Sequence, residues 1–159
     1  MNYSFLDLVY VKEQKSVQDA FAELKVTAQK ADELDFTRYW LAEHHNMEGV
    51  ASNATSVLMG YVAAHTHKIR VGSGGGMLPN HSPLAISEQF GTLAQMYPHR
   101  IDLGLGRAPG TDGLTAQYMN EHFMKNVQEF PKNVSLIQDF FSVENDNAKV
   151  RAYVAEGTG

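Results

Sequence analysis

Along the first two thirds of the chain, two patterns of apolar and polar positions alternate. Short, mostly apolar runs, typical of strands with both faces covered, occur at 3–9, 38–42, 69–72 and 101–105. Between these runs, apolar residues recur at steps of three and four, which indicates helices that bury one face. We therefore expect strands and helices to alternate four times along the chain.

The predicted helices begin at residues suited to capping. Ser16, Asn53 and Ser82 are the expected N-caps, because a short polar side chain accepts a hydrogen bond from the first helical turn. Pro83 follows at the first position of the third helix, where a missing N–H costs nothing. The core positions expected on the three helices are Val17, Ala20, Phe21, Leu24, Ala28 and Ala31; Val57, Leu58, Tyr61 and Ala64; and Ile86, Phe90, Leu93, Ala94 and Tyr97.

The alternation of strands and helices predicts an α/β fold with a parallel sheet and right-handed crossovers. The pattern alone does not separate a doubly wound sheet from a (β/α) barrel. We expect one domain that covers residues 1–159.

The last part of the chain, residues 108–159, has a different character. Residues 108–113 have the composition of a loop. A helical stripe at 120–141 contains Pro131, which removes a backbone donor and should kink or divide the helix. The remaining expected elements are a turn at 144–149 and a short strand at 150–155.

Composition narrows the classes of protein that the chain fits. It has 159 residues, 43% of them hydrophobic and 19% charged, as in ordinary globular proteins. The formal net charge of −5 argues against a nucleic-acid partner, and the lack of cysteine excludes disulfides and thiolate metal sites. Residues 1–5 do not begin a signal peptide, and no apolar run is long enough to span a bilayer. We expect a cytoplasmic protein without membrane partners.

The first candidate for chemistry is the tripeptide Glu43-His44-His45, which ends the second predicted strand. On an extended backbone Glu43 and His45 share one face and His44 takes the other. This geometry disfavours a metal site, which needs a third converging ligand, so we predict none. Two interpretations stay open at this point: a histidine that only bonds backbone groups, or an imidazole that acts as a general base or proton relay.

Two further strand ends carry unusual residues. Gly74, Gly75 and Gly76 indicate either a bulge or corner in the chain, or a close approach of the backbone to a planar ligand. Arg107 follows a glycine-rich strand end that lacks the third glycine of a dinucleotide fingerprint. Its guanidinium suits bidentate phosphate binding, or it pairs with a carboxylate such as Asp112 or Glu88.

Three ordered segments carry a resemblance to a known family. The segments RYWLAEHHNMEGVASNATSVLMGYVAA, VGSGGGMLPNHSPLAISEQFGTL and YPHRIDLGLGRAPGTD resemble the bacterial-luciferase-like flavin monooxygenases, and the likeness runs from Tyr3 to about Phe141. It is greatest to the single-chain, alkanal-monooxygenase-like branch. The resemblance implies a (β/α)8 TIM barrel that uses reduced FMN and O2 to oxidise a small organic substrate such as an aldehyde.

The resemblance also assigns roles to residues. It implies that His44 is catalytic, that the glycine run lies against the flavin ring and often carries a non-prolyl cis peptide, and that Arg107 contacts the FMN phosphate. We therefore expect His44, the glycine run and Arg107 to converge on one cleft. The cofactor-binding residues expected on this basis are Glu43, Gly74, Gly75, Gly76 and Arg107.

The family resemblance implies partners as well. It implies a homodimer through the helices near 53–65 and 83–97, and a flavin reductase that supplies reduced FMN. A complete barrel needs roughly 250 residues, so we expect the N-terminal half of a barrel with about four β/α units. We do not assume that this short chain is active alone. The alternatives are a non-catalytic flavin-binding protein, a dimerisation module or a deazaflavin-dependent oxidoreductase.

Overall fold

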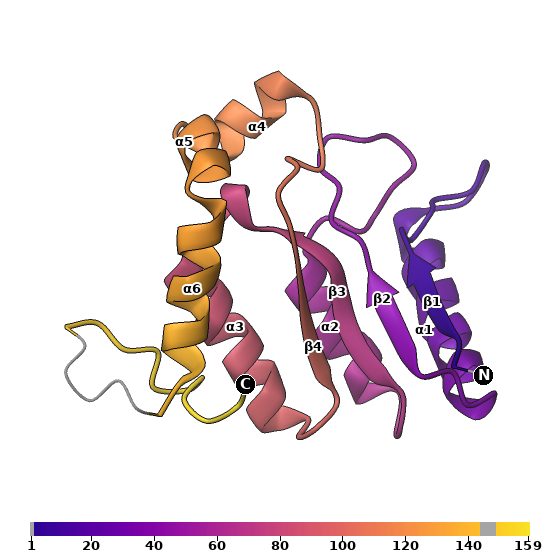
Figure 1. The fold of residues 1–159 in the computed structure, drawn as a ribbon. Coiled ribbons are helices and arrows are strands. Elements are labelled where there is room, and N and C mark those ends of the chain that lie inside the picture. The colour runs from indigo at the N-terminus through magenta and orange to yellow at the C-terminus, as the bar shows by residue number, and fades with distance from the viewer. Residues whose placement is uncertain (1, 144–148) are drawn as a thin grey trace. The chain divides into compact units, whose positions relative to one another are not determined.

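A computed structural model describes residues 2–143 and 149–159 of the chain (Figure 1). The chain divides into two compact units. The first unit contains the residues up to 76 together with 100–106, and the second contains 77–99 and 107–159. The single domain expected from the sequence stays a prediction.

The first unit is built on a four-stranded sheet in the order β1-β2-β3-β4. The strands are β1 (Ser4–Asp7), β2 (Arg38–Leu41), β3 (Arg70–Met77) and β4 (Ile101–Gly106). The pairs β1–β2 and β2–β3 are parallel, and their register aligns Asp7 with Leu41 and Leu41 with Ser73. The predicted parallel α/β arrangement is confirmed, and the carboxyl ends of these strands lie at one edge of the sheet.

Helix α1 (Val17–Glu33) follows β1 and begins where the sequence predicts. Ser16 accepts a hydrogen bond from the Asp19 N–H at 3.1 Å, and the Asp19 carboxylate accepts one from the Ser16 N–H at 2.9 Å. This reciprocal capping box satisfies two donors that the first turn would leave without partners. Most of the predicted stripe is buried, whereas Val17 is exposed; the buried members are Ala20, Leu24, Ala28 and Ala31.

Helix α2 (Thr55–Ala64) differs from its prediction in two ways. Its N-cap is Ala54, which makes no side-chain cap bond, so the assignment of Asn53 as the cap is wrong. Val57 and Ala64, both expected in the core, are exposed, and the exposed fraction of Val57 is 69%. The helix is apolar around most of its circumference, so its periodicity did not fix the buried side; the buried residues are Thr55, Leu58, Met59, Val62 and Ala63.

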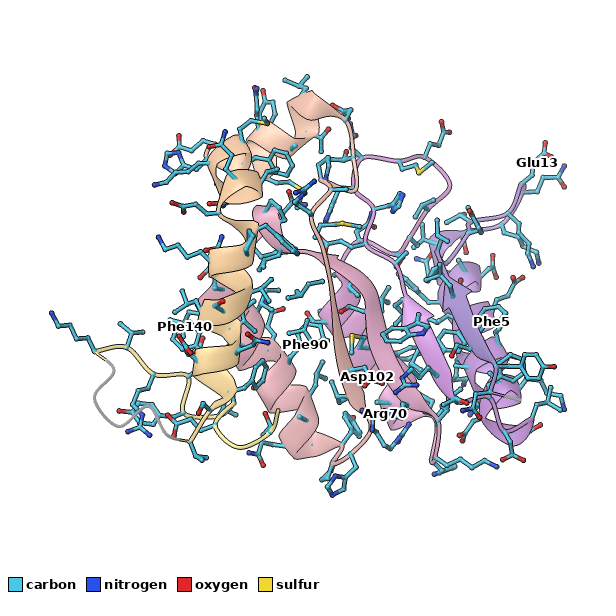
Figure 2. The ribbon with its side chains drawn as sticks, viewed as in Figure 1. Phe5, Glu13, Arg70, Phe90, Asp102 and Phe140 are labelled. Atoms are coloured by element: carbon cyan, nitrogen blue, oxygen red, sulfur yellow. The ribbon has the colours of Figure 1, made fainter. Side chains whose placement is uncertain are left out.

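The two faces of the sheet differ. Helices α1 and α2 lie on one side of it (Figure 1), and Tyr39, Leu41 and Val71 are fully buried. The alternate positions carry half-buried charges. The Asp102 carboxylate forms ion pairs with Arg38, whose Nε lies 3.0 Å from Oδ2, and with Arg70, whose Nη2 lies 2.6 Å from Oδ1. Figure 2 shows Arg70 and Asp102 side by side.

The second unit is helical. It contains a 3-10 turn (Leu78–Asn80), α3 (Pro83–Met96), α4 (Gly113–Met119), α5 (Phe123–Gln128) and α6 (Phe130–Phe141). Helices α3 and α6 run side by side (Figure 1). The N-cap at Ser82 and the position of Pro83 are confirmed. Pro131 lies in the first turn of α6, which confirms that it divides the predicted helix.

The C-terminal prediction of a strand at 150–155 is wrong. The segment forms turns, and its buried residues Ala152 and Ala155 pack in a core cluster with Phe140. A Cβ placed on Gly91 of α3 would lie 2.5 Å from the Ala155 Cα, so the turn fits directly against the helix backbone. The predicted turn at 144–149 lies outside the described residues except for Lys149.

Candidate active site

The loops that leave β1 and β2 are joined beyond the carboxyl edge of the sheet. The Val11 N–H donates to the Gly49 carbonyl at 2.8 Å, and the Ala51 N–H donates to the Val9 carbonyl at 2.9 Å. Val9 has a φ of +53°, a rare conformation for a β-branched residue, and its N–H donates to the Asp7 carboxylate at 2.7 Å. This conformation ends β1 before Val9, which is why the strand is shorter than predicted. Backbone strain of this kind is often found beside functional sites.

Residues 42–44, which follow β2, are fixed through their main chain. The Ala42 N–H donates to the Asp7 carbonyl at 3.0 Å, and the Ala42 carbonyl accepts hydrogen bonds from Ser52 Oγ and Thr55 Oγ1. The His44 N–H donates to the Ser52 carbonyl at 3.0 Å. The His44 carbonyl accepts a hydrogen bond from Asn53 Nδ2 at 2.6 Å.

The imidazole of His44 is half-buried and held in one orientation. Its Nδ1 lies 2.8 Å from the Glu43 carbonyl oxygen. Because a carbonyl only accepts, Nδ1 must carry the proton in this hydrogen bond. In the neutral ring Nε2 therefore holds the lone pair, which is the form that a general base needs. The geometry is compatible with the predicted role of His44, which stays a prediction.

Glu43 and His45 interact with each other, as the predicted shared face allows. The His45 Nε2 lies 2.8 Å from Glu43 Oε1, and Glu43 is only 2% exposed. Burial of a carboxylate requires such partners. No group of three or more His, Cys, Asp or Glu side chains in the described part of the chain could hold a metal ion.

The glycine run forms part of β3 rather than a corner after it, and the Gly74–Gly75 peptide is cis. A Cβ on Gly74 would lie 2.9 Å from the Trp40 Cβ, and one on Gly75 would lie 3.1 Å from the Gly106 nitrogen. Packing within the unit therefore accounts for both glycines. A Cβ on Gly76 would meet nothing closer than 3.7 Å. Neither packing nor a left-handed φ explains glycine at position 76.

Arg107 follows directly after Gly106, the last residue of β4, and is exposed. Within the described residues it forms no ion pair with either carboxylate suggested by the sequence. The Asp112 carboxylate instead caps α4, where it accepts hydrogen bonds from the Leu114 and Thr115 N–H groups at 3.0 Å each. The side chain of Arg107 is thus available for an anion, and its place in a shared cleft stays a prediction.

The prediction missed the three polar residues that follow the loop after β2: Ser52, Asn53 and Thr55. All three hold the main chain of residues 42–44. The run SNAT was a usable signal, since short polar side chains often bond neighbouring backbone groups. On its own, the run indicates only the start of a helix.

The family model described as "Luciferase-like monooxygenase" matches residues 1–153. The chain belongs to the luciferase-like monooxygenase family. A "Luciferase-like monooxygenase" of Escherichia coli (strain K12) is 51% identical over 149 residues, which cover 94% of this chain and 44% of that protein. The chain thus spans about half the length of the curated relatives that it matches.

Two solved structures have a fold similar to that of this chain. Apo-MsnO8 has a TM-score of 0.87 and 29% identity, over 95% of this chain and 45% of its own. The oxygenating constituent of 3,6-diketocamphane monooxygenase from Pseudomonas putida, solved in complex with FMN, has a TM-score of 0.77 and 20% identity, over 91% of this chain and 40% of its own. The predicted resemblance and the predicted fold, part of a TIM-barrel-type luciferase-like monooxygenase, are confirmed. Over the residues that the structure describes, no helix is long and apolar enough to cross a membrane.

Proposed function

We propose that this chain forms the cofactor-binding and proton-transferring part of a flavin-dependent monooxygenase, which uses reduced FMN and O2 to oxidise a small organic substrate such as an aldehyde. The observation that carries the proposal is the half-buried His44, whose Nδ1 is bonded to the Glu43 carbonyl, in a chain of the luciferase-like monooxygenase family. This bond leaves Nε2 as a proton acceptor at the carboxyl edge of the sheet, where ligands of parallel α/β folds bind.

Features within each of the two units support a flavin nucleotide as the ligand. Gly76 lacks a side chain where the protein itself leaves room for one, and a Cβ there would be 3.8 Å from the Glu43 carboxylate. A ring that lies against the main chain of Gly74–Gly76 would account for glycine at position 76. The exposed guanidinium of Arg107 suits the phosphate. When bound, reduced FMN supplies the electrons for O2 activation.

In this proposal His44 moves a proton at Nε2, while Glu43 and the glycine run bind the cofactor. The main-chain contacts of residues 42–44 keep the imidazole in place before substrate arrives, which favours catalysis by orientation. Glu43 keeps its carboxylate against His45, so that this buried charge has a partner.

We also propose a homodimer through the helices near 53–65 and 83–97 and a flavin reductase as the source of reduced FMN. For the dimer, the support on the first unit is an apolar pocket of about 400 Å³ on the outer side of α2, lined in part by Phe21, Val57 and Tyr61. Exposed apolar surfaces of this kind are typical of interaction sites.

The proposal is tested by titrating the 159-residue chain with FMN and with riboflavin, and then following aldehyde oxidation with a flavin reductase. His44→Ala should bind FMN normally but lower turnover by roughly 10²–10⁴-fold. Arg107→Ala should weaken the binding of FMN more than that of riboflavin. A chain that binds no FMN, or a His44→Ala variant with full turnover, would contradict the proposal. FMN binding without turnover by the wild-type chain would favour a non-catalytic flavin protein.

A further inference from the structure

Asn53 has the sequence position of a helix cap but bonds to a different partner. Helix α2 starts at Thr55 behind Ala54, and no side chain caps it. Asn53 instead directs its amide Nδ2 to the carbonyl of His44, nine residues back along the chain, at 2.6 Å. A local stabilising contact that asparagine commonly makes is thus replaced by a contact with the residue proposed as the base.

Asn53 completes the set of contacts around His44. On one side, the His44 N–H donates to the Ser52 carbonyl at 3.0 Å. On the other side, the His44 carbonyl accepts a hydrogen bond from Asn53 Nδ2. With both peptide groups held, only rotation about the side-chain bonds remains for the imidazole, and its Nδ1 contact to the Glu43 carbonyl at 2.8 Å limits that rotation.

We propose that Asn53 is a positioning residue for His44, because its amide N–H holds the His44 carbonyl and keeps the ring with Nδ1 protonated and Nε2 free to accept a proton. The importance of this orientation for turnover rests on the proposed function. The orientation itself does not, because it follows from contacts within the first unit. Ser52 and Thr55 bond the carbonyl of Ala42, two residues earlier, and so do not hold the peptide group that follows the imidazole.

The test compares Asn53→Asp and Asn53→Ala with wild type. Asn53→Asp keeps the size of the side chain but removes the N–H donors. Asn53 is exposed, so we expect both variants to fold, and thermal melts establish this. The control is Asn2→Asp, which makes the same charge change at another exposed residue of the first unit.

The first readout is the tautomer of neutral His44, measured by NMR on the 15N-histidine-labelled chain, with His44→Gln used to assign the signal. Wild type and the control should show a protonated Nδ1. Both Asn53 variants should show a shift toward the tautomer with a protonated Nε2, which imidazole prefers in water. A purely structural role for Asn53 would lower the melting temperature without changing the tautomer.

The second readout is turnover, for which we expect a loss of about tenfold to hundredfold in kcat in the Asn53 variants, with FMN affinity unchanged. A His44 ring that keeps a protonated Nδ1 in both variants, or that carries its proton on Nε2 in wild type, would overturn the inference. If the wild-type chain lacks FMN binding, the proposed function fails while the NMR comparison still decides the role of Asn53.

Discussion

A pair of glycine substitutions separates glycines that the fold needs from a glycine that a ligand needs. Gly104 and Gly76 lie close together, since a Cβ on Gly76 would be 3.7 Å from the Gly104 carbonyl oxygen. A Cβ on Gly104 would lie 2.3 Å from the main-chain carbonyl oxygen of Ser73. This is about 1 Å closer than ordinary van der Waals contact, and the carbonyl belongs to a strand that cannot move freely.

We therefore expect Gly104→Ala to lower the free energy of unfolding by about 1–3 kcal/mol through overpacking. For a chain of this size that corresponds to a fall of roughly 2–12 °C in Tm. Gly76→Ala creates no such overlap, and the φ of Gly76 lies outside the left-handed region. Its effect on stability should be neutral or stabilising by up to about 1 kcal/mol, because alanine restricts the unfolded chain.

Flavin binding should be affected in Gly76→Ala, the variant that keeps its stability. A methyl group at position 76 would occupy the space beside the Glu43 carboxylate, so we expect the affinity of Gly76→Ala for FMN to fall about tenfold or more, equivalent to ~1.4 kcal/mol. Thermal melts and fluorescence titration with FMN measure both effects. The reasoning is refuted if Gly76→Ala loses as much stability as Gly104→Ala, or if it binds FMN as wild type does.

Two further predictions concern stability and assembly. Burial raises the pKa of Asp32. Hydrogen bonds from the His67, Ile69 and Lys68 N–H groups, together with the charge of Arg100, lower this pKa by more than burial raises it, so the net shift is downward. The stabilisation by ionised Asp32 should therefore be complete above the unfolded carboxyl pKa of about 3.9 and should disappear as the pH falls through the lower folded pKa. Asp32→Asn should lower the free energy of unfolding by ~1–3 kcal/mol and flatten the acid part of the denaturation profile. An unchanged profile would contradict this role of Asp32. Val57→Asp, on the exposed side of α2, should shift the chain from dimer to monomer in sedimentation experiments without unfolding it, whereas a wild-type chain that sediments as a monomer would count against the proposed dimer.

Local chemistry made most of the first unit predictable, and long-range contacts account for what was not. Ser16 caps α1 in the first unit, and Ser82 caps α3 in the second, because these capping bonds involve residues only three positions away. Asn53 has the same local signal, yet its amide bonds a carbonyl that only the fold brings near. The reason for glycine at position 74 is equally non-local, since Trp40 of the neighbouring strand occupies the space of a side chain.

The second unit shows the same limit. The segment 150–155 is apolar at most positions, as a short strand can be, but it forms turns that bury Ala152 and Ala155 in the cluster with Phe140. Asp112 was a plausible partner for Arg107 by proximity in sequence. The start of α4 uses that carboxylate, because helix N-termini leave N–H groups without partners.

The most direct test of the central claim is an NMR titration of the 15N-labelled chain with FMN. If the carboxyl edge of the sheet binds the flavin beside the proposed base, the amide signals of His44 and Gly76 should shift together and saturate at one FMN per chain. Signals around Asp32, at the C-terminal end of α1, should stay unchanged. Saturable shifts confined to other parts of the chain, or no shifts at all, would contradict the claim that this edge is the flavin site.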